Sequence, residues 1–411
     1  MLAKSGKICF DSELGFYSRL TEFYSQGMRI GIDCRIMYSP ESGGAGVPHY
    51  IFHVAKNLLA IDRQNEYFLF FDEKSAVWDE FKAPNVHCVL ISGARFRRFL
   101  PLVYSQLVYA WVLRRFKLDI FHATNTGIPY FYRGRSITTV HDLGVYLRPE
   151  FFSWGQRLGT RLIFPHSFRR AAKIILVSWL LADDMNHLFP EYRHKLTAIQ
   201  EGVSPVRETP TVAETDAVME KFQLRREKFF LFIGTLEPRK NLLRLIAAFE
   251  KAMDDTPSAW RELKLVLAGR PGYRSAEIVA AARHSRYARF IILPGYISAQ
   301  EKNILLREAA AFVFPSLWEG FGLGNLEAMA VGTPVIASDI PVVREITGGA
   351  ATLVHPEDIF SWSKRMRSMV TNKEMRERLH QAGYRRVSLF SWKLCAQQTL
   401  AEYEKLQKIK V

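Results

Sequence analysis

The stretch PSLWEGFGLGNLEAMAVGTPVIASD, residues 315–339, decides how the second half of this chain folds. It follows an apolar run and carries two carboxylates, Glu319 and Glu327, with glycines between them. Glycine costs backbone entropy, and a carboxylate needs a partner wherever it leaves water. The pattern therefore predicts a strand, a ligand-binding loop and a helix, with a hydroxyl-rich ligand as the partner of the acids.

The same alternation of short apolar runs and helical patterns extends through the rest of the chain. In the first half the predicted strands are MRIGIDCR, EYFLFFD, VHCVLIS, LDIFHAT, SITTVHD and KIILVS. In the second half they are KFFLFIGT, LKLVLAGR, RFIILPG, AAFVFPS, TPVIASD and AATLVHP. Between the halves, residues 202–227 are rich in Pro, Thr, Glu and Arg, which predicts a linker with a short helix. Near-continuous apolar strands that alternate with helices indicate parallel sheets covered on both faces.

A chain of 411 residues exceeds the size at which one core stops growing. We therefore predict an α/β protein with two tandem Rossmann-like, doubly wound parallel-sheet domains and a cleft between them. Ligands of such sheets bind beyond the carboxyl ends of the strands. The predicted parts are an N-terminal extension, an N-terminal Rossmann-like domain, a C-terminal Rossmann-like domain and a last helix that packs back on the first domain: 1–27, 28–205, 206–390 and 391–411.

Bulk composition narrows the class of protein. Hydrophobic residues make up 48% and charged residues 24%, which is ordinary globular composition, but the net charge of +15 implies an anionic partner. The four cysteines form no metal-ligand spacing and indicate reduced thiols in a cytosol. Residues 1–27 precede a second methionine, Met28, which opens a strand directly. We interpret these residues as a dispensable extension or an overlong start assignment.

Two cations stand where the first strand of the second half gives way to a helix. The segment FIGTLEPRKNLLRLIAAF, residues 232–249, places Arg239 and Lys240 at this junction. Free N–H groups and the helix dipole add to side-chain charge at such a position. The pair therefore predicts a phosphate site, with a solvated basic turn as the alternative.

EPRKN together with PSLWEGFGLGNLEAMAVGTPVIASDIP resembles the donor half of glycosyltransferase family 4, the retaining enzymes with the GT-B fold. The resemblance implies that Arg239 and Lys240 hold a donor diphosphate and that Glu319 contacts the transferred sugar. It also implies that Glu327 accepts hydrogen bonds from the ribose hydroxyls. Backbone groups that would line the sugar and phosphate are those of Gly320, Phe321, Gly322 and Leu323. In one place the chain departs from the family pattern, because Gly324 stands where proline is frequent.

The first half contributes further candidates. SITTVHDLGVYLRPEFF places His141 and Asp142 at the carboxyl end of a strand. In family 4 a histidine after the matching strand contacts the donor sugar, which implies a catalytic role for His141. An ordinary polar loop histidine and, for Asp142, a turn cap are the alternatives. The loop SPESGGAGVPHY resembles the family's glycine-rich loop, which implies donor binding by Gly43, Gly44 and Gly46.

The expected enzyme is a hexosyltransferase that moves a sugar, with mannose as first candidate, from a nucleotide-diphospho-sugar to a saccharide or lipid-linked acceptor of a surface polysaccharide pathway. RIGIDCR…GGAG and SDIPVVREI resemble mannosyltransferase members. We expect no cofactor and no metal, because no acidic DxD cluster lies near the site. Two alternatives remain open: a glycoside hydrolase that uses Glu319 and Glu327, and a catalytically silent GT-B binding subunit.

The excess charge is concentrated in two regions. ARFRRFLPLVYSQLVYAWVLRRFKLD, residues 94–119, has basic clusters on either side of an aromatic run in which Leu100, Tyr104, Leu107 and Trp111 fall near one helical face. A second basic region extends from Arg157 to Lys173. These regions predict either a core helix with solvated ends or a contact with anionic lipid. We expect a cytoplasmic protein at the inner face of the membrane, and no nucleic-acid partner, because no recognised nucleic-acid module is present.

Overall fold

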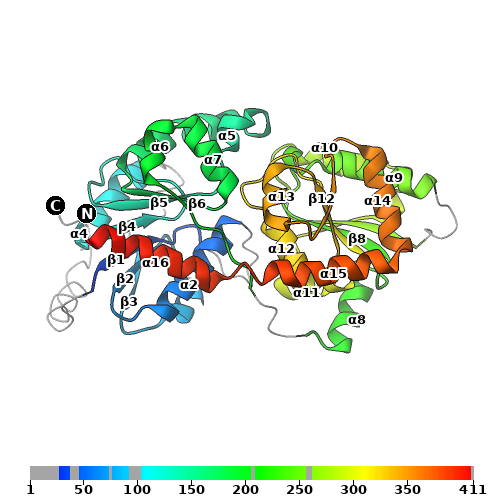
Figure 1. The fold of residues 1–411 in the computed structure, drawn as a ribbon, viewed down its shortest axis with the longest axis horizontal. Helices are drawn as coiled ribbons and strands as arrows, with labels where there is room; N and C mark the ends of the chain where they lie inside the picture. Colours follow the sequence, from blue (N-terminus) through cyan, green and yellow to red (C-terminus); the bar gives the residue numbers. More distant parts are fainter. Residues whose placement is uncertain are drawn as a thin grey trace, which may run out of the picture.

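The computed structural model describes residues 27–37, 46–73, 76–91, 103–204, 209–255 and 262–408. These residues form two parallel sheets, each with its own helices (Figure 1). Gly43 and Gly44, the first basic cluster before residue 103 and nearly all of the extension 1–27 lie outside the described residues.

The N-terminal sheet has seven strands in the order β3-β2-β1-β4-β5-β6-β7, and every neighbouring pair is parallel. Its strands are β1 (Arg29–Asp33), β2 (Glu66–Phe71), β3 (Val86–Leu90), β4 (Ile120–Ala123), β5 (Ser136–Val140), β6 (Lys173–Leu176) and β7 (Leu196–Ala198). The helices and turns between them are α2 (Val47–Ile61), η2 (Ala76–Phe81), η4 (Tyr104–Val108), α4 (Tyr109–Arg115), α5 (Gly144–Leu147), η5 (Pro149–Phe151), α6 (Trp154–Arg170), α7 (Trp179–Leu188) and η6 (Pro190–Lys195).

The C-terminal sheet has six parallel strands in the order β10-β9-β8-β11-β12-β13. These are β8 (Phe229–Ile233), β9 (Lys264–Ala268), β10 (Ile291–Gly295), β11 (Ala311–Phe314), β12 (Val335–Ser338) and β13 (Thr352–Val354). The helices and turns are α8 (Val212–Lys221), η7 (Pro238–Lys240), α9 (Leu242–Asp254), α10 (Ser275–His284), η8 (Ala288–Phe290), α11 (Ala299–Glu308), α12 (Leu323–Ala330), α13 (Pro341–Thr347), α14 (Ile359–Thr371) and α15 (Lys373–Val387).

The predicted strands lie where the apolar runs placed them, and the predicted α/β fold class is confirmed. One strand was missed. β7 has only three residues, Leu196–Ala198, each of them only partly buried. So short a run has no apolar signal of its own, and it becomes a strand because the edge of β6 is available for pairing.

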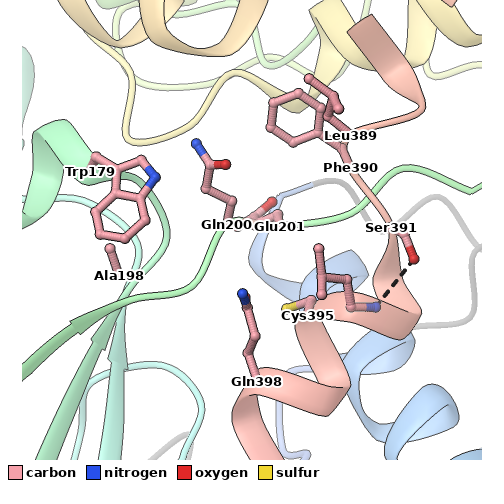
Figure 2. A pocket seen from close by; sticks show the side chains of 10 residues that line it. Trp179, Ala198, Gln200, Glu201, Leu389, Phe390, Ser391, Cys395 and Gln398 are labelled. Carbon is pink, nitrogen blue, oxygen red and sulfur yellow. Dashed lines mark hydrogen bonds between the residues drawn. The ribbon is translucent and has the colours of Figure 1, made fainter. Parts of the chain in front are cut away.

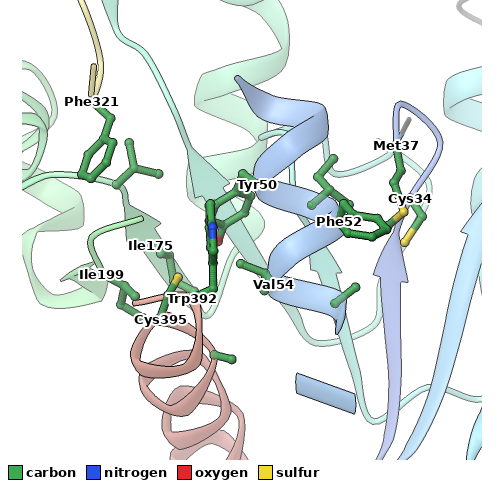
Figure 3. Close-up of a cluster of buried hydrophobic side chains, with 14 of the residues drawn as sticks. Cys34, Met37, Tyr50, Phe52, Val54, Ile175, Ile199, Phe321, Trp392 and Cys395 are labelled. Carbon is green, nitrogen blue, oxygen red and sulfur yellow. The ribbon is translucent and has the colours of Figure 1, made fainter. Parts of the chain in front are cut away.

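The last helix, α16 (Trp392–Lys408), leaves the C-terminal sheet and lies along α2 of the N-terminal half (red and blue in Figure 1). Trp392 is 4% exposed, and its ring lies 6.1 Å from the ring of Tyr50 on α2 (Figure 3). Phe321 of the C-terminal half belongs to the same buried cluster. Apolar packing thus joins the two halves next to their facing loops.

The aromatic run around residues 103–115 differs from its expected geometry. Tyr104 is 1% exposed, whereas Leu107 and Trp111 are 47% and 52% exposed, so these three side chains do not share one environment. A π-helical turn, η4, lies at the start of this helix. A π turn contains more residues than an α-helical turn. The residues that follow it are therefore rotated away from the face that regular α-helical spacing predicts. Within the described residues, no helix combines the length and hydropathy needed to cross a bilayer.

Candidate functional site

The phosphate-site candidates and the first acid meet because their strands are neighbours. Arg239 and Lys240 follow β8, Glu319 follows β11, and β8 pairs with β11 in the sheet. Parallel strands end at the same edge, so their following loops lie side by side. The backbone N–H of Leu317 donates to the carbonyl oxygen of Arg239 at 2.8 Å, which fixes the two loops to each other.

Glu319 contacts both cations. Its Oε2 lies 3.0 Å from Arg239 Nη1, and its Oε1 accepts a hydrogen bond from Lys240 Nζ. A second carboxylate, Glu237, lies 2.6 Å from Arg239 Nε. The side chains of Glu319 and Lys240 are only 9% and 10% exposed. The expected anion site is therefore a compact cluster in which the charges of two cations are matched by two carboxylates.

The electrostatics of this cluster keep Glu319 ionised. Burial alone would raise the pKa of its carboxyl group, but the charges of Lys240 and Arg239 and their hydrogen bonds lower that pKa to about 2. Burial would likewise lower the pKa of the Arg239 guanidinium, yet Glu319, Glu237 and Asp142 raise it. An ionised acid and a charged guanidinium are thus held together near the carboxyl edge.

Glu327 lies near the middle of α12 and pairs with a different cation. Lys302 Nζ on α11 donates to Glu327 Oε1 at 2.7 Å. Burial would raise the pKa of Glu327, but Lys302 and His49 of α2 lower it. Burial lowers the pKa of His49 to about 4, although the charge of Glu327 opposes this shift. The second acid is therefore ionised and near the start of α2 in the N-terminal half.

The glycine-rich loop between the two acids has the geometry of a helix start. Gly322, the residue before α12, has φ +95°, a conformation that favours glycine. Leu323 opens the helix, and no side chain caps its first N–H groups. The side chain of Phe321 is 5% exposed and lies in the core, 6.1 Å from the ring of Phe390, so only its backbone faces the loop.

The loops of the two sheets touch at Gly320. A Cβ atom on Gly320 would lie 1.7 Å from the carbonyl oxygen of His141, so only glycine fits there. Ser178 Oγ donates to the carbonyl oxygen of Gly320 at 3.0 Å. Trp318 Nε1 donates to Asp142 Oδ1 at 2.8 Å. The structure therefore brings His141 and Asp142 against the loop that carries Glu319, and Asp142 serves as a contact between the two halves.

His141 is held by two hydrogen-bond partners. Its Nε2 lies 2.8 Å from the carbonyl oxygen of Thr124, and its Nδ1 lies 3.3 Å from Glu201 Oε1. A carbonyl oxygen only accepts, so Nε2 must carry a proton and donate it. The contact at Nδ1 then becomes a hydrogen bond only if a further proton lies between His141 and Glu201. Glu201 therefore faces the imidazole of His141 beside the loop of Glu319.

Glu201 is the residue that sequence reasoning missed. It stands in TAIQEGVSP, a loose match to a family motif, and no spacing in the sequence indicates a partner for it. Glu201 is 5% exposed, and its partner, His141, lies 60 positions earlier in the chain. The available signal was the loose motif match itself, an acid that stands three residues beyond the end of β7.

Gly46 is the described part of the predicted glycine-rich donor loop. It precedes α2 with φ +66°, and a Cβ atom there would meet nothing within 4 Å. Backbone geometry, and not crowding, therefore favours glycine at this position. The structure describes no contact between Gly46 and the acids, while His49, one turn later, lies close enough to Glu327 to shift its pKa.

A small cavity lies beside this site (Figure 2). It has a volume of about 60 Å³ and is lined by the start of α7, the end of β7 with the segment after it, the turn before α16 and the first turns of α16 itself. Glu201, Gln200 and Trp179 are among them. This volume suits a few water molecules next to Glu201 and is too small for a nucleotide-sugar.

The side chains of the described residues offer little support for a bound metal ion. Across the described ranges, no group of His, Cys, Asp and Glu side chains has the arrangement of a metal site. The acids nearest the loops, Glu319 and Glu327, already pair with Arg239, Lys240 and Lys302. The expectation that no metal takes part stays a prediction.

Models of known protein families match both halves of the chain. A family model described as Glycosyltransferase Family 4 matches residues 44–207, and one described as Glycosyl transferases group 1 matches residues 215–386. The O-antigen chain mannosyltransferase B of Escherichia coli is 28% identical over 372 residues, covering 88% of this chain and 96% of that protein. The O-antigen chain mannosyltransferase RfbU of Salmonella typhimurium is 28% identical over 289 residues, covering 70% and 75%.

Solved structures agree on the fold. Sucrose-phosphate synthase from Thermosynechococcus elongatus superimposes with a TM-score of 0.71 at 18% identity, covering 93% of this chain and all of that one. HepE of Anabaena in complex with UDP and glucose gives a TM-score of 0.69 at 16% identity, with 92% of this chain covered. With both halves matched by family models and the two sheets arranged as in these structures, the chain belongs to glycosyltransferase family 4 and is a glycosyltransferase with the GT-B fold, related to bacterial O-antigen mannosyltransferases.

Proposed function

We propose that this glycosyltransferase moves a hexose, with mannose as first candidate, from a nucleotide-diphospho-sugar to a saccharide or lipid-linked acceptor, with retention of configuration. The observation that carries the proposal is the cluster of Arg239, Lys240 and Glu319 at the carboxyl edge of the C-terminal sheet, against the loop of His141. Two fixed cations suit a diphosphate, and an ionised carboxylate suits sugar hydroxyl groups.

Donor binding would exchange partners within this cluster. The diphosphate takes the cations Arg239 and Lys240, and the free N–H groups at the start of α12 add to the same anion site. Glu319 then turns to hydroxyl groups of the transferred sugar. Glu327 exchanges Lys302 for the ribose hydroxyls in the same way. The backbone of Gly320, Phe321, Gly322 and Leu323 would line the donor, and the predicted donor-binding role of Gly43, Gly44 and Gly46 is retained as part of this proposal.

Transfer then needs orientation and charge stabilisation more than proton transfer by the protein. The bond from the anomeric carbon to the diphosphate oxygen breaks, and the acceptor hydroxyl oxygen bonds to the same carbon from the same face. The leaving phosphate oxygen takes the hydroxyl proton. Arg239 and Lys240 stabilise the charge that grows on the diphosphate, an effect of roughly 3–4 kcal/mol for an important donor. His141 would reach the transferred sugar only if donor binding exchanged one of its two present partners, the carbonyl oxygen of Thr124 or Glu201 Oε1, for a sugar oxygen.

The names of the similar proteins support the choice of substrates. Two of them are O-antigen mannosyltransferases, and a third structural relative, WaaG, is a glycosyltransferase involved in lipopolysaccharide biosynthesis with a TM-score of 0.67 at 15% identity. The HepE structures contain UDP and UDP-glucose, so a uracil nucleotide is the rival of guanosine diphosphate mannose. A lipid-linked acceptor would bring the enzyme to an anionic membrane surface at the cytoplasmic face.

The hydrolase alternative conflicts with the electrostatics. A glycoside hydrolase needs one carboxylic acid that keeps its proton near neutral pH, which requires a raised pKa. The pKa values of Glu319 and Glu327 are both lowered by neighbouring cations. Neither residue suits the role of general acid.

The test is a thermal-shift screen of the full chain with nucleotide diphosphates and nucleotide-sugars, followed by NMR of the product anomer. A ligand at 100 times its Kd stabilises a protein by about 2.7 kcal/mol, which raises the melting temperature measurably. We expect GDP-mannose to give the largest shift and the product to retain configuration. Glu327→Gln should raise the donor Kd, and Glu319→Gln should lower kcat, while Glu374→Gln on the exposed side of α15 should change neither. No shift with any nucleotide diphosphate, or an inverted product, would overturn the proposal.

A further inference from the structure

Helix α6 exposes a continuous apolar stripe. Its start is fixed by a capping box in which Ser153 and Gln156 exchange hydrogen bonds. From there Trp154, Leu158 and Leu162 follow at four-residue spacing and are 72%, 45% and 57% exposed. Residues four apart lie on one helical face, so these side chains form one stripe on the surface of the N-terminal half.

A second apolar stripe lies on η4 and α4. Val103, Leu107 and Trp111 are 43%, 47% and 52% exposed. The π-helical turn keeps them at the surface while it turns Tyr104 inward to hydrogen-bond with Asp72. Large apolar side chains are normally scattered singly on a monomer surface, and two such stripes need an explanation.

The loop between β4 and β5 joins the two stripes. The backbone N–H of Tyr130 donates to Gln106 Oε1 on η4 at 2.8 Å, and Tyr130 Oη donates to the carbonyl oxygen of Leu162 on α6 at 2.8 Å. Arg114 on α4 donates to the carbonyl oxygen of Phe131. Tyr130 and Phe131 are themselves 37% and 51% exposed. We call the joined set the apolar belt: Val103, Leu107, Trp111, Tyr130, Phe131, Trp154, Leu158 and Leu162.

The charges within the three chain segments that form the apolar belt have one sign. The segments that form it, residues 103–118, 127–135 and 154–173, contain neither Asp nor Glu. Their cations are Arg114, Arg115, Lys117, Arg133, Arg135, Arg157, Arg161, Arg169, Arg170 and Lys173. The segments that carry Trp111 and Trp154 therefore contribute much of the chain's excess positive charge.

We propose that the apolar belt and its arginines dock this enzyme on an anionic lipid bilayer. Indole and phenol rings favour the headgroup level, leucine side chains enter the acyl boundary, and arginine heads pair with lipid phosphates while their stems cover apolar surface. A nucleic-acid surface would explain the cations but not an apolar stripe of Leu and Trp on α6. The proposal deepens the proposed function, and rests on it, because it names the surface on which a lipid-linked acceptor is met.

The position of the belt relative to the site fits this role. Helix α6 begins after His141, Asp142, α5 and η5, at the carboxyl edge of the N-terminal sheet, and then runs away from that edge. Trp154 thus lies at the end of the stripe that is closest in sequence to the site. Docking through α6 brings the loops of His141 and Glu319 near the headgroup layer, where a lipid-linked sugar is accessible.

The test is flotation of the full chain with phosphatidylglycerol-containing vesicles and with neutral phosphatidylcholine vesicles. We expect binding to the anionic vesicles at least tenfold stronger, reduced by 0.5 M salt, with a blue shift of tryptophan emission. The variant Leu158→Gln/Leu162→Gln and the variant Arg157→Gln/Arg161→Gln should each weaken this binding about tenfold or more. The matched control is Leu243→Gln/Arg365→Gln on the C-terminal half, where Leu243 is 45% exposed and Arg365 is exposed.

Each outcome is decisive. Equal binding to both vesicle types, belt variants that float like the control, or wild type that binds RNA but no vesicle would overturn the docking surface. The melting-temperature shift by nucleotide diphosphates, measured without lipid, reports separately on the donor site. Loss of vesicle binding with an unchanged melting-temperature shift by nucleotides contradicts only the docking proposal. Vesicle binding without any melting-temperature shift by nucleotides contradicts the proposed function. Circular dichroism of each variant shows whether it is folded.

Discussion

At the scale of single residues, the site depends on partners that lie far away in the sequence. Arg239 and Glu319 are 80 positions apart and Lys302 and Glu327 are 25 apart, yet each pair is in direct contact. Removing one member of a buried pair leaves a charge without compensation, which costs about 3–5 kcal/mol. The acids and cations of the site should therefore contribute to folding as well as to substrate binding.

Glu319 should make stability depend on pH in a predictable direction. Its pKa is lowered to about 2 in the folded chain, from 4.5 for an isolated group. Its contribution is therefore fully present above about pH 5 and is lost as the pH falls toward 2, because the unfolded chain takes up the proton first. The difference corresponds to about 3 kcal/mol.

Urea denaturation across this pH range measures the effect. We expect Glu319→Gln to be less stable than wild type at pH 7 by about this amount, and the gap to shrink between pH 5 and pH 2.5. The exposed substitution Glu374→Gln should leave the pH profile unchanged. A gap of constant size over the whole range would show that Glu319 is not held ionised by its cations.

Glu201 should be a positioning residue for His141. In Glu201→Gln the amide N–H can still donate to Nδ1, so the ring keeps its orientation while the negative charge of its partner is removed. We expect kcat to fall about 10- to 100-fold with little change in the donor KM. Glu201→Ala removes the partner altogether and should lower kcat further.

The comparison of these two variants separates charge from orientation. Activity of Glu201→Gln equal to wild type, together with a poor Glu201→Ala, would show that Glu201 only orients the ring. Equal activity of all three proteins would remove Glu201 from the reaction. Nucleotide-induced melting-temperature shifts, expected to be unchanged, serve as the control for donor binding.

At the scale of elements, helix α7 is capped by a residue of the other half. Glu345 on α13 accepts hydrogen bonds from the backbone N–H groups of Trp179 and Leu180, at 2.9 and 2.8 Å, and from Gln200 Nε2 at 2.7 Å. A carboxylate at a helix N-terminus satisfies unpaired N–H groups and interacts favourably with the dipole. This contact holds the two sheets in their present arrangement.

Glu345→Ala should loosen that arrangement. Loss of a helix cap typically costs about 0.5–2 kcal/mol of unfolding free energy. We expect this loss, together with a larger radius of gyration in X-ray scattering because the halves separate more often. Glu377→Ala, an exposed position on α15, is the matched control. An unchanged radius of gyration would mean that the loop contacts at Gly320 hold the halves together without Glu345.

At the scale of the whole molecule, α16 couples the two halves. It follows α15 of the C-terminal half but packs on α2, and Tyr403 near its end lies 2.6 Å from His122 Nδ1 at β4. His53 of α2 stacks on Trp392 with ring centroids 5.0 Å apart. The N-terminal core is therefore completed by the last residues of the chain.

Trp392→Ala should destabilise the N-terminal half strongly. Truncating a buried aromatic side chain costs about 3–5 kcal/mol, because it removes apolar burial and leaves a cavity. We expect the midpoint of urea unfolding to fall accordingly, while Leu394→Ala, at a position 45% exposed, stays within about 0.5 kcal/mol of wild type. A small effect of Trp392→Ala would show that α2 is stable without α16.

The sequence by itself determined the α/β alternation, nearly all of the strands, and the loop segments that carry Arg239, Lys240, Glu319, Glu327 and His141. These follow from short-range rules: apolar periodicity fixes the strands, and glycines and charges mark the loops at their ends. These rules did not predict strand β7, which has three partly buried residues, because pairing with β6 and not its composition makes it a strand.

Only the tertiary structure decided which groups meet. The pairing of Glu319 with both cations, the contact of Glu201 with His141, the cap of Glu345 on α7 and the joining of two exposed stripes through Tyr130 all link distant segments. Strand order and the close approach of the two sheets bring these segments together. Neither is encoded in local spacing, because a hydrogen bond or ion pair depends on distance in space and not on separation along the chain.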